Sequence, residues 1–471
     1  MPIATTNPAT GQVLKTYDPM SDEQVDSAIE RAHLAFRQLC DDTTVAQRGR
    51  WLIAAAELLE AERDETARMM TTEMGKTYAA AQAEVTKCAT ACRFYAENAV
   101  RMLADEPADA AAVKARRAFI RYQPIGPVLA VMPWNFPLWQ VMRFAAPALM
   151  AGNTGLLKHA SNVPQTALYL EELFRRAGFP EGAFTTLLVG SDAVDRILSD
   201  PRVRAATLTG SEVAGRSIAQ IAGRELKKTV LELGGSDPFV VMPSADLDRA
   251  AEVATTARCQ NNGQSCIAAK RFIVHTDVFD AFADRFAARM SALRVGDPMD
   301  DATDVGPLAS ERGRAEVHAQ VQDAADSGAT ILCGGELPAG DGWFYPPTVV
   351  TDLRPGMRMW AEEVFGPVAG LYRASSYEEA IEIANGTSFG LGSNAWTTDP
   401  AEQERFAADL DAGSVFINGM TTSYPELPFG GVKNSGYGRE LSAVGMREFC
   451  NTKTVWVGAG EAGAGAGAHA E

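Results

Sequence analysis

One cysteine stands in a segment whose residue types suit nucleophilic chemistry. The run Asn262-Gly-Gln-Ser-Cys266 has polar neighbours and a glycine three residues before the thiol, which fits an exposed turn. A thiol attacks as its thiolate, so Cys266 would need a nearby base or a helix N-terminus. The alternative, a buried structural cysteine, is the commoner fate of an intracellular cysteine. The segment alone therefore makes Cys266 a candidate nucleophile and leaves both interpretations open.

The other cysteines are interpreted as structural. Cys88 and Cys92 are spaced for one face of a helix, but no further Cys or His stands at zinc-ligand spacing, so we expect core packing and no metal site. The six lie in helix-like or terminal segments: Cys40, Cys88, Cys92, Cys259, Cys333 and Cys450.

An acidic residue and an amide residue follow two predicted strands. Glu232 ends a β-rich run and precedes Gly234-Gly235, where a carboxyl can face a cleft and burial can raise its pKa toward that of a general base. Asn135 lies in Pro133-Trp-Asn-Phe-Pro137, where two prolines hold the loop and its amide could donate to an oxyanion. The alternatives are a surface glutamate and an ordinary turn.

A third segment suits phosphate binding. Leu208-Thr-Gly-Ser-Glu-Val-Ala-Gly215 follows a predicted strand and begins a helix that Ser211 is suited to cap. Free backbone N–H groups at a helix start bind phosphate, but Gly210 and Gly215 do not form the G-x-G-x-x-G fingerprint. None of the five histidines stands beside a serine or cysteine in a recognisable arrangement, which argues against a Ser–His–Asp or Cys–His mechanism.

The elements that must position these residues alternate between strands and helices. Such alternation predicts an open, mostly parallel α/β sheet, and it occurs in two series. Val128–Met132 is uninterrupted and apolar, as in a strand buried on both faces. The other predicted strands are 119–122, 154–158, 184–189, 205–209, 228–233, 239–242, 271–275, 330–332 and 348–350. The predicted helices are 22–39, 47–70, 79–103, 165–177, 214–224, 277–292, 315–327 and 377–384.

Composition narrows the class of protein. The 471 residues include 43 Lys+Arg and 60 Asp+Glu, a net charge of −17 that disfavours binding to nucleic acid or to an anionic membrane. Seven cysteines are too few for a disulfide scaffold, so we expect a reducing cytoplasmic location. No signal peptide or membrane-spanning run is apparent. Residues 459–471 are low in complexity and predicted to be disordered.

Taken together, the motifs resemble those of the aldehyde dehydrogenase superfamily. The resemblance extends from Asn7-Pro8 to Trp456 and is greatest to the short bacterial succinate-semialdehyde dehydrogenases, through Trp139-Gln-Val-Met-Arg143, Leu157-Lys-His-Ala160 and Ala268-Ala-Lys-Arg-Phe272. The ordered motifs are Pro133-Trp-Asn-Phe-Pro137, Lys158, Thr209-Gly-Ser211, Glu232-Leu-Gly-Gly235, Gly263-Gln-Ser-Cys266, Glu363-Val-Phe-Gly-Pro367 and Pro428-Phe-Gly-Gly-Val-Lys-Asn-Ser-Gly436.

The resemblance implies a role for each catalytic candidate. Cys266 attacks the aldehyde carbonyl, and the Asn135 side chain and the Cys266 backbone N–H hold the oxyanion. Hydride transfer to a nicotinamide leaves a thioester, which water activated by Glu232 hydrolyses. The glutamate also argues against a CoA-acylating branch of the family.

The resemblance further implies a dinucleotide site. Lys158 binds the adenosine ribose, and Glu363 binds the nicotinamide ribose. Strongly NAD-selective members have a glutamate where Ser161 stands, so NADP is expected to be accepted and NAD remains open. The other implied cofactor-binding residues are Trp134, Gly210, Ser211, Leu233 and Phe365.

For the substrate, the resemblance implies that Arg143 binds a distal carboxylate, as a guanidinium does well. Gln260 stands where many relatives have a second arginine, and Ser423 lies near another carboxylate contact. Phe144 replaces a lysine that many members use with a glutamate at the Glu440 position, so Glu440 is not assigned a catalytic role. The expected reaction is the oxidation of succinate semialdehyde. The alternatives are a broad-range enzyme for aromatic or short aliphatic aldehydes and a non-catalytic member.

The implied architecture has three parts. A Rossmann-like cofactor-binding domain comprises residues 1–113 and 126–234, and an α/β catalytic domain comprises residues 235–451. A bridging element, 114–125 with 452–458, would extend a neighbour's sheet, so a homodimer or homotetramer is expected.

Overall fold

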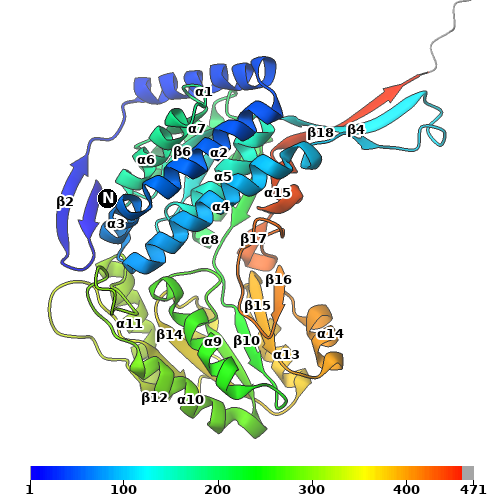
Figure 1. Cartoon of the computed structure of the whole chain (residues 1–471). Helices are drawn as coiled ribbons and strands as arrows, with labels where there is room; N and C mark the ends of the chain where they lie inside the picture. Colours follow the sequence, from blue (N-terminus) through cyan, green and yellow to red (C-terminus); the bar gives the residue numbers. More distant parts are fainter. Residues whose placement is uncertain (1, 459–471) are drawn as a thin grey trace, which may run out of the picture.

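The computed structural model describes residues 2–458 and contains two open α/β sheets, each with helices packed on it (Figure 1). An arm of antiparallel strands projects from the upper sheet in this view. The predicted disordered tail, 459–471, lies outside the described residues. Among the described residues, no helix is both long and apolar enough to cross a membrane.

The first sheet has six strands in the order β17-β9-β8-β5-β6-β7. All neighbouring strands are parallel except β17, which pairs antiparallel with β9. The predicted open, mostly parallel sheet is therefore confirmed. Its strands are β5 (Pro127–Met132), β6 (Thr154–His159), β7 (Phe184–Thr186), β8 (Ala205–Thr209), β9 (Lys228–Glu232) and β17 (Gly436–Tyr437).

Helices cover both faces of this sheet. Val128 and Ala130 of β5 pack on one face with α2, α4, α5 and α6, while Leu129 packs on the other with α1, α7 and α8. Successive side chains of a strand point to opposite faces, so a strand between two helical layers must be apolar throughout. The helices are α1 (Asp22–Asp42), α2 (Val45–Ala61), α4 (Tyr78–Met102), α5 (Trp139–Ala151), α6 (Pro164–Arg176), α7 (Val194–Ser199) and α8 (Glu212–Arg224).

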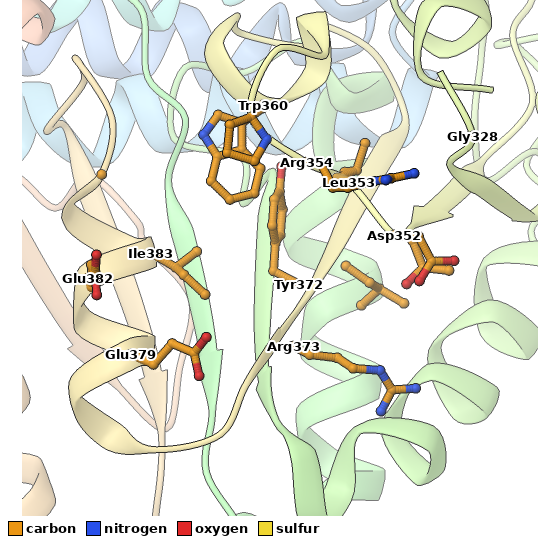
Figure 2. Close-up of a pocket in the computed structure, with 14 residues that line it drawn as sticks. Gly328, Asp352, Leu353, Arg354, Trp360, Tyr372, Arg373, Glu379, Glu382 and Ile383 are labelled. Atoms are coloured by element: carbon orange, nitrogen blue, oxygen red, sulfur yellow. The ribbon is translucent and has the colours of Figure 1, made fainter. Parts of the chain in front are cut away.

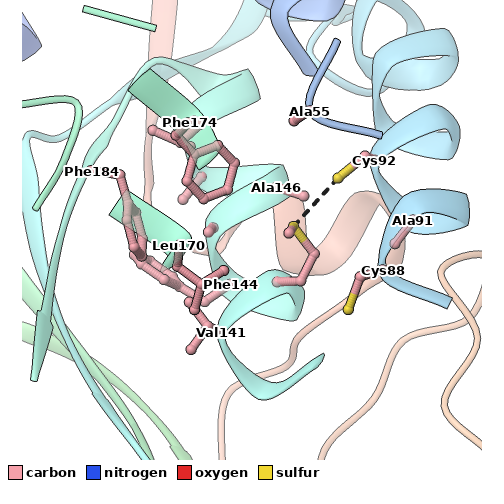
Figure 3. Close-up of a cluster of buried hydrophobic side chains, with 14 of the residues drawn as sticks. Ala55, Cys88, Ala91, Cys92, Val141, Phe144, Ala146, Leu170, Phe174 and Phe184 are labelled. Atoms are coloured by element: carbon pink, nitrogen blue, oxygen red, sulfur yellow. Dashed lines mark hydrogen bonds between the residues drawn. The ribbon is translucent and has the colours of Figure 1, made fainter. Parts of the chain in front are cut away.

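The packing of α4 on α5 buries two of the cysteines. Cys88 and Cys92 point from α4 toward α5 (Figure 3), and the Cys92 sulfur lies 3.4 Å from the Met142 sulfur. Neither cysteine belongs to a group of three potential metal ligands within residues 2–458. Both thiols are fully buried and pack as small apolar groups, so the expected core packing is confirmed.

The second sheet has seven strands in the order β12-β13-β14-β11-β10-β15-β16. Only the β12–β13 pair is antiparallel. The sequence did not predict β14, β15 or β16. The strands are β10 (Pro238–Val241), β11 (Arg271–His275), β12 (Thr330–Cys333), β13 (Thr348–Thr351), β14 (Val368–Ala374), β15 (Gly392–Trp396) and β16 (Ser414–Ile417). The helices of this part are α9 (Leu247–Cys259), α10 (Phe279–Ala292), α11 (Glu311–Asp326), α12 (Arg358–Ala361), α13 (Tyr377–Asn385) and α14 (Pro400–Asp409).

The projecting arm pairs strands from two distant parts of the chain. Strand β18 (Cys450–Val457) pairs antiparallel with all of β4 (Arg117–Pro124), and β4 also pairs with β3 (Glu106–Pro107). Helix α15 (Ser442–Glu448) precedes β18 and contacts α5. An N-terminal hairpin of β1 (Ile3–Asn7) and β2 (Gln12–Tyr17) was not predicted.

One predicted helix was wrong in its extent. The continuous helix expected over 47–70 is two helices, α2 and α3 (Arg63–Met74), which meet at Glu62 with φ −103° and ψ 14°. At this break Glu62 accepts hydrogen bonds from Tyr169 and Arg176 of α6. The break thus coincides with contacts to a helix that is distant in the sequence. Local periodicity carries no information on such contacts, so the break could not be predicted from it.

Candidate active site

Cys266 lies in a loop that reverses direction immediately after α9. Asn261, Asn262 and Gly263 all have positive φ, at 53°, 57° and 73°. Asparagine tolerates this left-handed conformation better than most residues. The Asn262 amide donates to the carbonyls of Gly75 and Pro307 at 2.8 and 3.0 Å, so long-range contacts stabilise the turn.

Gly263 brings a second motif against the cysteine loop. A Cβ atom at Gly263 would lie 2.3 Å from the carbonyl carbon of Gly366, too close for any side chain. Only glycine permits this approach, which places the loop of Cys266 directly against the Glu363–Pro367 segment.

Cys266 lines two adjoining cavities, and Gln140 also lines both of them. The first cavity, about 220 Å³, is bounded by Pro133, Trp134, Asn135, Gln140, Thr209, Gly210, Ser211, Leu233, Gly234, Cys266, Glu363 and Phe365. The second cavity, about 270 Å³, is bounded by Ala80, Ala83, Glu84, Lys87, Phe136, Trp139, Gln140, Arg143, Gln260, Asn261, Ser265, Cys266, Ile267, Met420, Thr422 and Ser423.

Asn135 is held beside the nucleophile loop. Its side chain is only 3% exposed, and its Nδ2 donates to the carbonyl of Gln264 at 3.1 Å. The backbone carbonyl of Asn135 accepts a hydrogen bond from the Asn261 side-chain amide at 2.7 Å, so a second hydrogen bond joins the two loops. An amide nitrogen carries two hydrogens, so the second remains for an oxyanion at the first cavity.

The resting Cys266 thiol is protonated at neutral pH. Burial raises its pKa to about 12, although Arg143 and Lys270 stabilise the thiolate. The preceding residues Asn262, Gln264 and Ser265 are buried, although the sequence predicted an exposed turn, and Cys266 is half-buried. The thiol must lose its proton to another group before it can attack.

Glu232 has a buried carboxyl group with a raised pKa, as a general base requires. It is 1% exposed, and neither carboxyl oxygen has a hydrogen-bond partner within residues 2–458. Burial raises its pKa well above the ordinary value, and the Glu440 carboxylate raises it further. The raised pKa enables Glu232 to accept a proton in its ionised form and to retain it.

Glu440, which the sequence left unassigned, forms a buried ion pair. Arg143 Nε lies 2.6 Å from Glu440 Oε2, and the guanidinium also stacks over the Phe429 ring at 4.6 Å. Phe144 instead packs edge-on against Phe449 in the core. The arginine therefore supplies the cation beside Glu440 in a chain that has no lysine at position 144.

The predicted substrate residues all line the second cavity. Gln260 donates to the carbonyl of Ala257 at 3.4 Å, and Ser423 accepts hydrogen bonds from Lys87 and Trp139. Arg143 lines the same cavity while paired with Glu440. The structure thus brings Arg143, Gln260 and Ser423 together around Cys266.

The first cavity can hold the nicotinamide end of a dinucleotide. Trp134, Gly210, Ser211, Leu233, Glu363 and Phe365 line it. Ser211 caps α8, where free N–H groups suit a phosphate, and a Cβ atom at Gly215 would meet Leu233 at 2.7 Å. Helix α8 therefore lies close enough to β9 to place its N-terminus at the cavity.

The predicted adenosine residues lie outside that cavity lining. Lys158 stands at the end of β6, donates to the carbonyl of His159 at 3.0 Å, and has no ion-pair partner within residues 2–458. Burial lowers its pKa, which Asp192 partly opposes. Ser161 is half-buried, and its backbone carbonyl accepts a hydrogen bond from the backbone N–H of Ala4. An unpaired, half-buried ammonium fits an anionic cofactor group.

Three further residues position or line the site and were missed by the sequence analysis. Lys270 donates to the carbonyls of Ser265, Cys266 and Ala268 and lies 3.3 Å from Glu363, so it ties the nucleophile loop to the ribose-binding candidate. Gln264 accepts from the N–H of Ala309. Lys87 lines the second cavity. Lys270 stands in the Ala268-Ala-Lys-Arg-Phe272 motif and Gln264 in the Gly263-Gln-Ser-Cys266 motif, whereas Lys87 lies in no motif that marked it.

A further cavity, about 770 Å³, lies elsewhere (Figure 2). It is located at β13, β14 and α13, where Trp360 and Tyr372 pack edge-on at 5.3 Å. Its charged residues have both signs, and Arg373 is already paired with Asp280. It contains none of the predicted site residues.

Comparisons of the sequence and of the structure with known proteins agree on one family. The sequence matches the model of the aldehyde dehydrogenase family over residues 1–455. It is 67% identical to the succinate-semialdehyde dehydrogenase (NADP+) of Mycolicibacterium paratuberculosis, with all of both chains covered. It is also 67% identical to succinate-semialdehyde dehydrogenase (NADP+) 1 of Mycobacterium tuberculosis, covering 97% of this chain and all of that one. The crystal structure of succinic semialdehyde dehydrogenase from Streptococcus pyogenes in complex with NADP+ has a TM-score of 0.95 and 40% identity, covering 97% of this chain and 100% of that one.

Proposed function

Because this chain belongs to the aldehyde dehydrogenase family, we propose that it oxidises succinate semialdehyde to succinate with NADP as the hydride acceptor. The observation that carries the proposal is the placement of Cys266 where two cavities adjoin. One cavity suits the nicotinamide, and the other presents cationic side chains to the substrate. A non-catalytic role is disfavoured because Cys266 and Asn135 line one cavity, and the Glu232 carboxyl, although outside the lining of both cavities, lies close enough to Cys266 to raise the pKa of its thiol.

The residues divide the reaction into two halves. The Cys266 thiolate adds to the aldehyde carbon, and the carbonyl oxygen becomes an oxyanion that accepts from the Asn135 amide and the Cys266 backbone N–H. When bound, the dinucleotide supplies the acceptor for the hydride that the thiohemiacetal loses as it becomes a thioester. Ionised Glu232 then takes a proton from water, hydroxide attacks the thioester carbon, and the carboxylic acid leaves as the Cys266 thiolate reforms.

The proposal is tested by NADPH formation with a pair of aldehydes of equal chain length. Succinate semialdehyde is expected to give a kcat/KM at least tenfold above that of butanal, roughly the contribution of one charge-assisted contact. A higher value for butanal would instead indicate a broad-range enzyme, for which the apolar walls Phe136, Trp139, Ile267 and Met420 would be sufficient.

Ser161→Glu is expected to change the cofactor preference. A carboxylate near Lys158 would repel a 2′-phosphate and accept a hydrogen bond from a 2′-hydroxyl, so kcat/KM for NADP should fall by about tenfold to a hundredfold. The value for NAD should stay level or rise. Ser161→Gln, which adds similar bulk without charge, is the matched control. Equal losses with both cofactors in both variants would contradict the assignment of Ser161.

We further propose that the protein self-associates through its arm. Strand β18 is an edge strand, and Trp456 on it is 55% exposed. An unpaired strand edge with an exposed aromatic side chain is suited to extending the sheet of a second copy.

Trp456→Asp is therefore expected to weaken the oligomer. The buried charge should raise the dissociation constant by about tenfold or more, as seen by sedimentation velocity. Val13→Asp, on the exposed N-terminal hairpin, is the control and should not change the assembly. A monomeric wild type would contradict the proposed assembly.

A cytoplasmic location is part of the proposal. All seven cysteines are free thiols, and disulfides form in oxidising compartments. The reducing environment keeps Cys266 available for attack.

A further inference from the structure

Two hydrogen-bond donors share a single acceptor on one wall of the second cavity. Lys87 Nζ and Trp139 Nε1 each donate to Ser423 Oγ at 3.0 Å. Two accepted hydrogen bonds occupy the lone pairs of the hydroxyl, and its own hydrogen is donated to no residue within 2–458. An ammonium has three hydrogens, of which Lys87 uses one here. The wall therefore presents several donors to whatever occupies the cavity.

The charge of Lys87 is not neutralised by the surrounding protein. Within residues 2–458 no carboxylate lies within ion-pair distance of it. Glu84, one helical turn earlier in α4, is paired with Lys76 and accepts from the N–H groups of Leu138 and Trp139. The ammonium instead lies 4.4 Å from the centre of the Trp139 ring.

Arg143 differs from Lys87 in this respect. It shares the cavity, but its charge is paired with Glu440 at 2.6 Å. One of its nitrogens, Nη2, is buried without a hydrogen-bond partner. The cavity is thus lined by Arg143, whose charge is paired with Glu440, and by Lys87, whose charge is not paired. Lys87 is adjacent to the Ser423 hydroxyl, which is free to donate its hydrogen.

We propose that Lys87, together with the Ser423 hydroxyl, binds the distal carboxylate of the substrate and so selects a dicarboxylic semialdehyde over an uncharged aldehyde. This inference rests on the proposed function and deepens it, because it assigns the selection mainly to Lys87. Arg143 lines the same cavity while its charge remains engaged with Glu440. An anion at this position would supply acceptors to donors that otherwise lack them.

The titration of Lys87 agrees with this role. Burial, together with the nearby Arg143 charge, lowers the pKa of Lys87 to about 8, while Cys88 and Glu84 partly oppose the change. A bound carboxylate favours the ammonium, so binding of the anion is strongest below about pH 8 and weakens as Lys87 loses its proton above it.

The principal test is Lys87→Met with succinate semialdehyde and butanal as paired substrates. Methionine keeps an unbranched side chain that can cover Trp139 but removes the charge and the donors. KM for succinate semialdehyde should rise by about tenfold or more, with kcat changed less, because the contact acts away from the reacting carbon. The kcat/KM for butanal should remain within about twofold of the wild type. Lys87→Arg should restore part of the preference, and Arg101→Met, on the exposed surface of the same helix, is the matched control.

Two outcomes separate this inference from the proposed function. If the wild type shows no preference for succinate semialdehyde over butanal, the proposed function itself fails. If the wild type shows the preference and folded Lys87→Met retains it, the assignment to Lys87 is overturned while the proposed function stands. Arg143→Met is not a suitable substitute for this test, because it would leave the buried Glu440 without its cation.

A second measurement needs no lysine variant. Inhibition of butanal oxidation by succinate should weaken above about pH 8 in the wild type, by up to tenfold per pH unit, and Ser423→Ala should weaken it at every pH. Inhibition that is independent of pH between 7 and 9.5 and unchanged by Ser423→Ala would overturn the inference even if Lys87→Met fails to fold.

Discussion

Replacing Cys266 with serine is expected to lower NADPH formation from succinate semialdehyde by about a thousandfold or more. A serine hydroxyl has a far higher pKa than a thiol, and the buried position at Cys266 already raises the pKa of the thiol to about 12. Nothing in the cavity described here would ionise an alcohol to a useful extent. Serine is also a poorer leaving group, so both halves of the reaction should be affected.

The control for this variant is Cys40→Ser. Cys40 is exposed near the end of α1, away from both cavities, and its loss should leave the rate unchanged. The fold of Cys266→Ser should remain intact, with a Tm close to that of the wild type, because the side chain differs by one atom. Substantial turnover by folded Cys266→Ser would show that the nucleophile lies elsewhere.

Glu232→Gln is expected to separate the two halves of the reaction. Glutamine keeps the shape of the side chain but cannot accept a proton, so acylation of Cys266 can proceed while hydrolysis of the thioester stops. Rapid mixing should show a burst of about one NADPH per active site followed by a steady rate about a hundredfold to ten-thousandfold below the wild type. This burst distinguishes a defect in hydrolysis from a general loss of folding.

The pH dependence provides an independent check on Glu232. Burial and Glu440 raise the pKa of the Glu232 carboxyl, so the ionised base becomes more abundant as pH rises. The wild-type kcat should therefore increase with pH wherever hydrolysis is rate-limiting, and the residual rate of Glu232→Gln should lack that increase. Glu404→Gln, at an exposed position on α14, is the control and should behave as the wild type. Absence of a burst, together with a wild-type pH profile in Glu232→Gln, would remove Glu232 from the assignment.

Much of the fold could be predicted where burial dictates the residue pattern. Strand β8 begins and ends at the predicted residues, and β5 differs by one residue at its start, because both strands lie between two helical layers and must be apolar throughout. Strands β14 to β16 and the N-terminal hairpin were missed, since short strands carry little periodicity of their own. The break at Glu62 depends on contacts with α6, which no local window contains.

The site shows the same division between local and long-range information. Asn135, Glu232 and Cys266 could be selected because each stands in a short segment with distinctive neighbours, and the structure places Asn135 and Cys266 on one cavity. Lys87 carries no such local mark. Its partner Ser423 is 336 residues away, so its role becomes visible only when α4 and the loop before β17 are brought together. Similarly, Phe144 concealed the role of Glu440, whose cation comes from Arg143.

The proposed reaction centres on one covalent event, the transfer of the acyl group of the substrate to Cys266. Peptide mapping by mass spectrometry, after an acid quench of Glu232→Gln incubated with succinate semialdehyde and NADP, detects that event directly. We predict one succinyl thioester on the peptide that contains Cys266, dependent on both reactants and absent from the Cys266→Ser, Glu232→Gln double variant. NADPH formation without any acyl group on Cys266, or with the acyl group on another cysteine, would contradict the account.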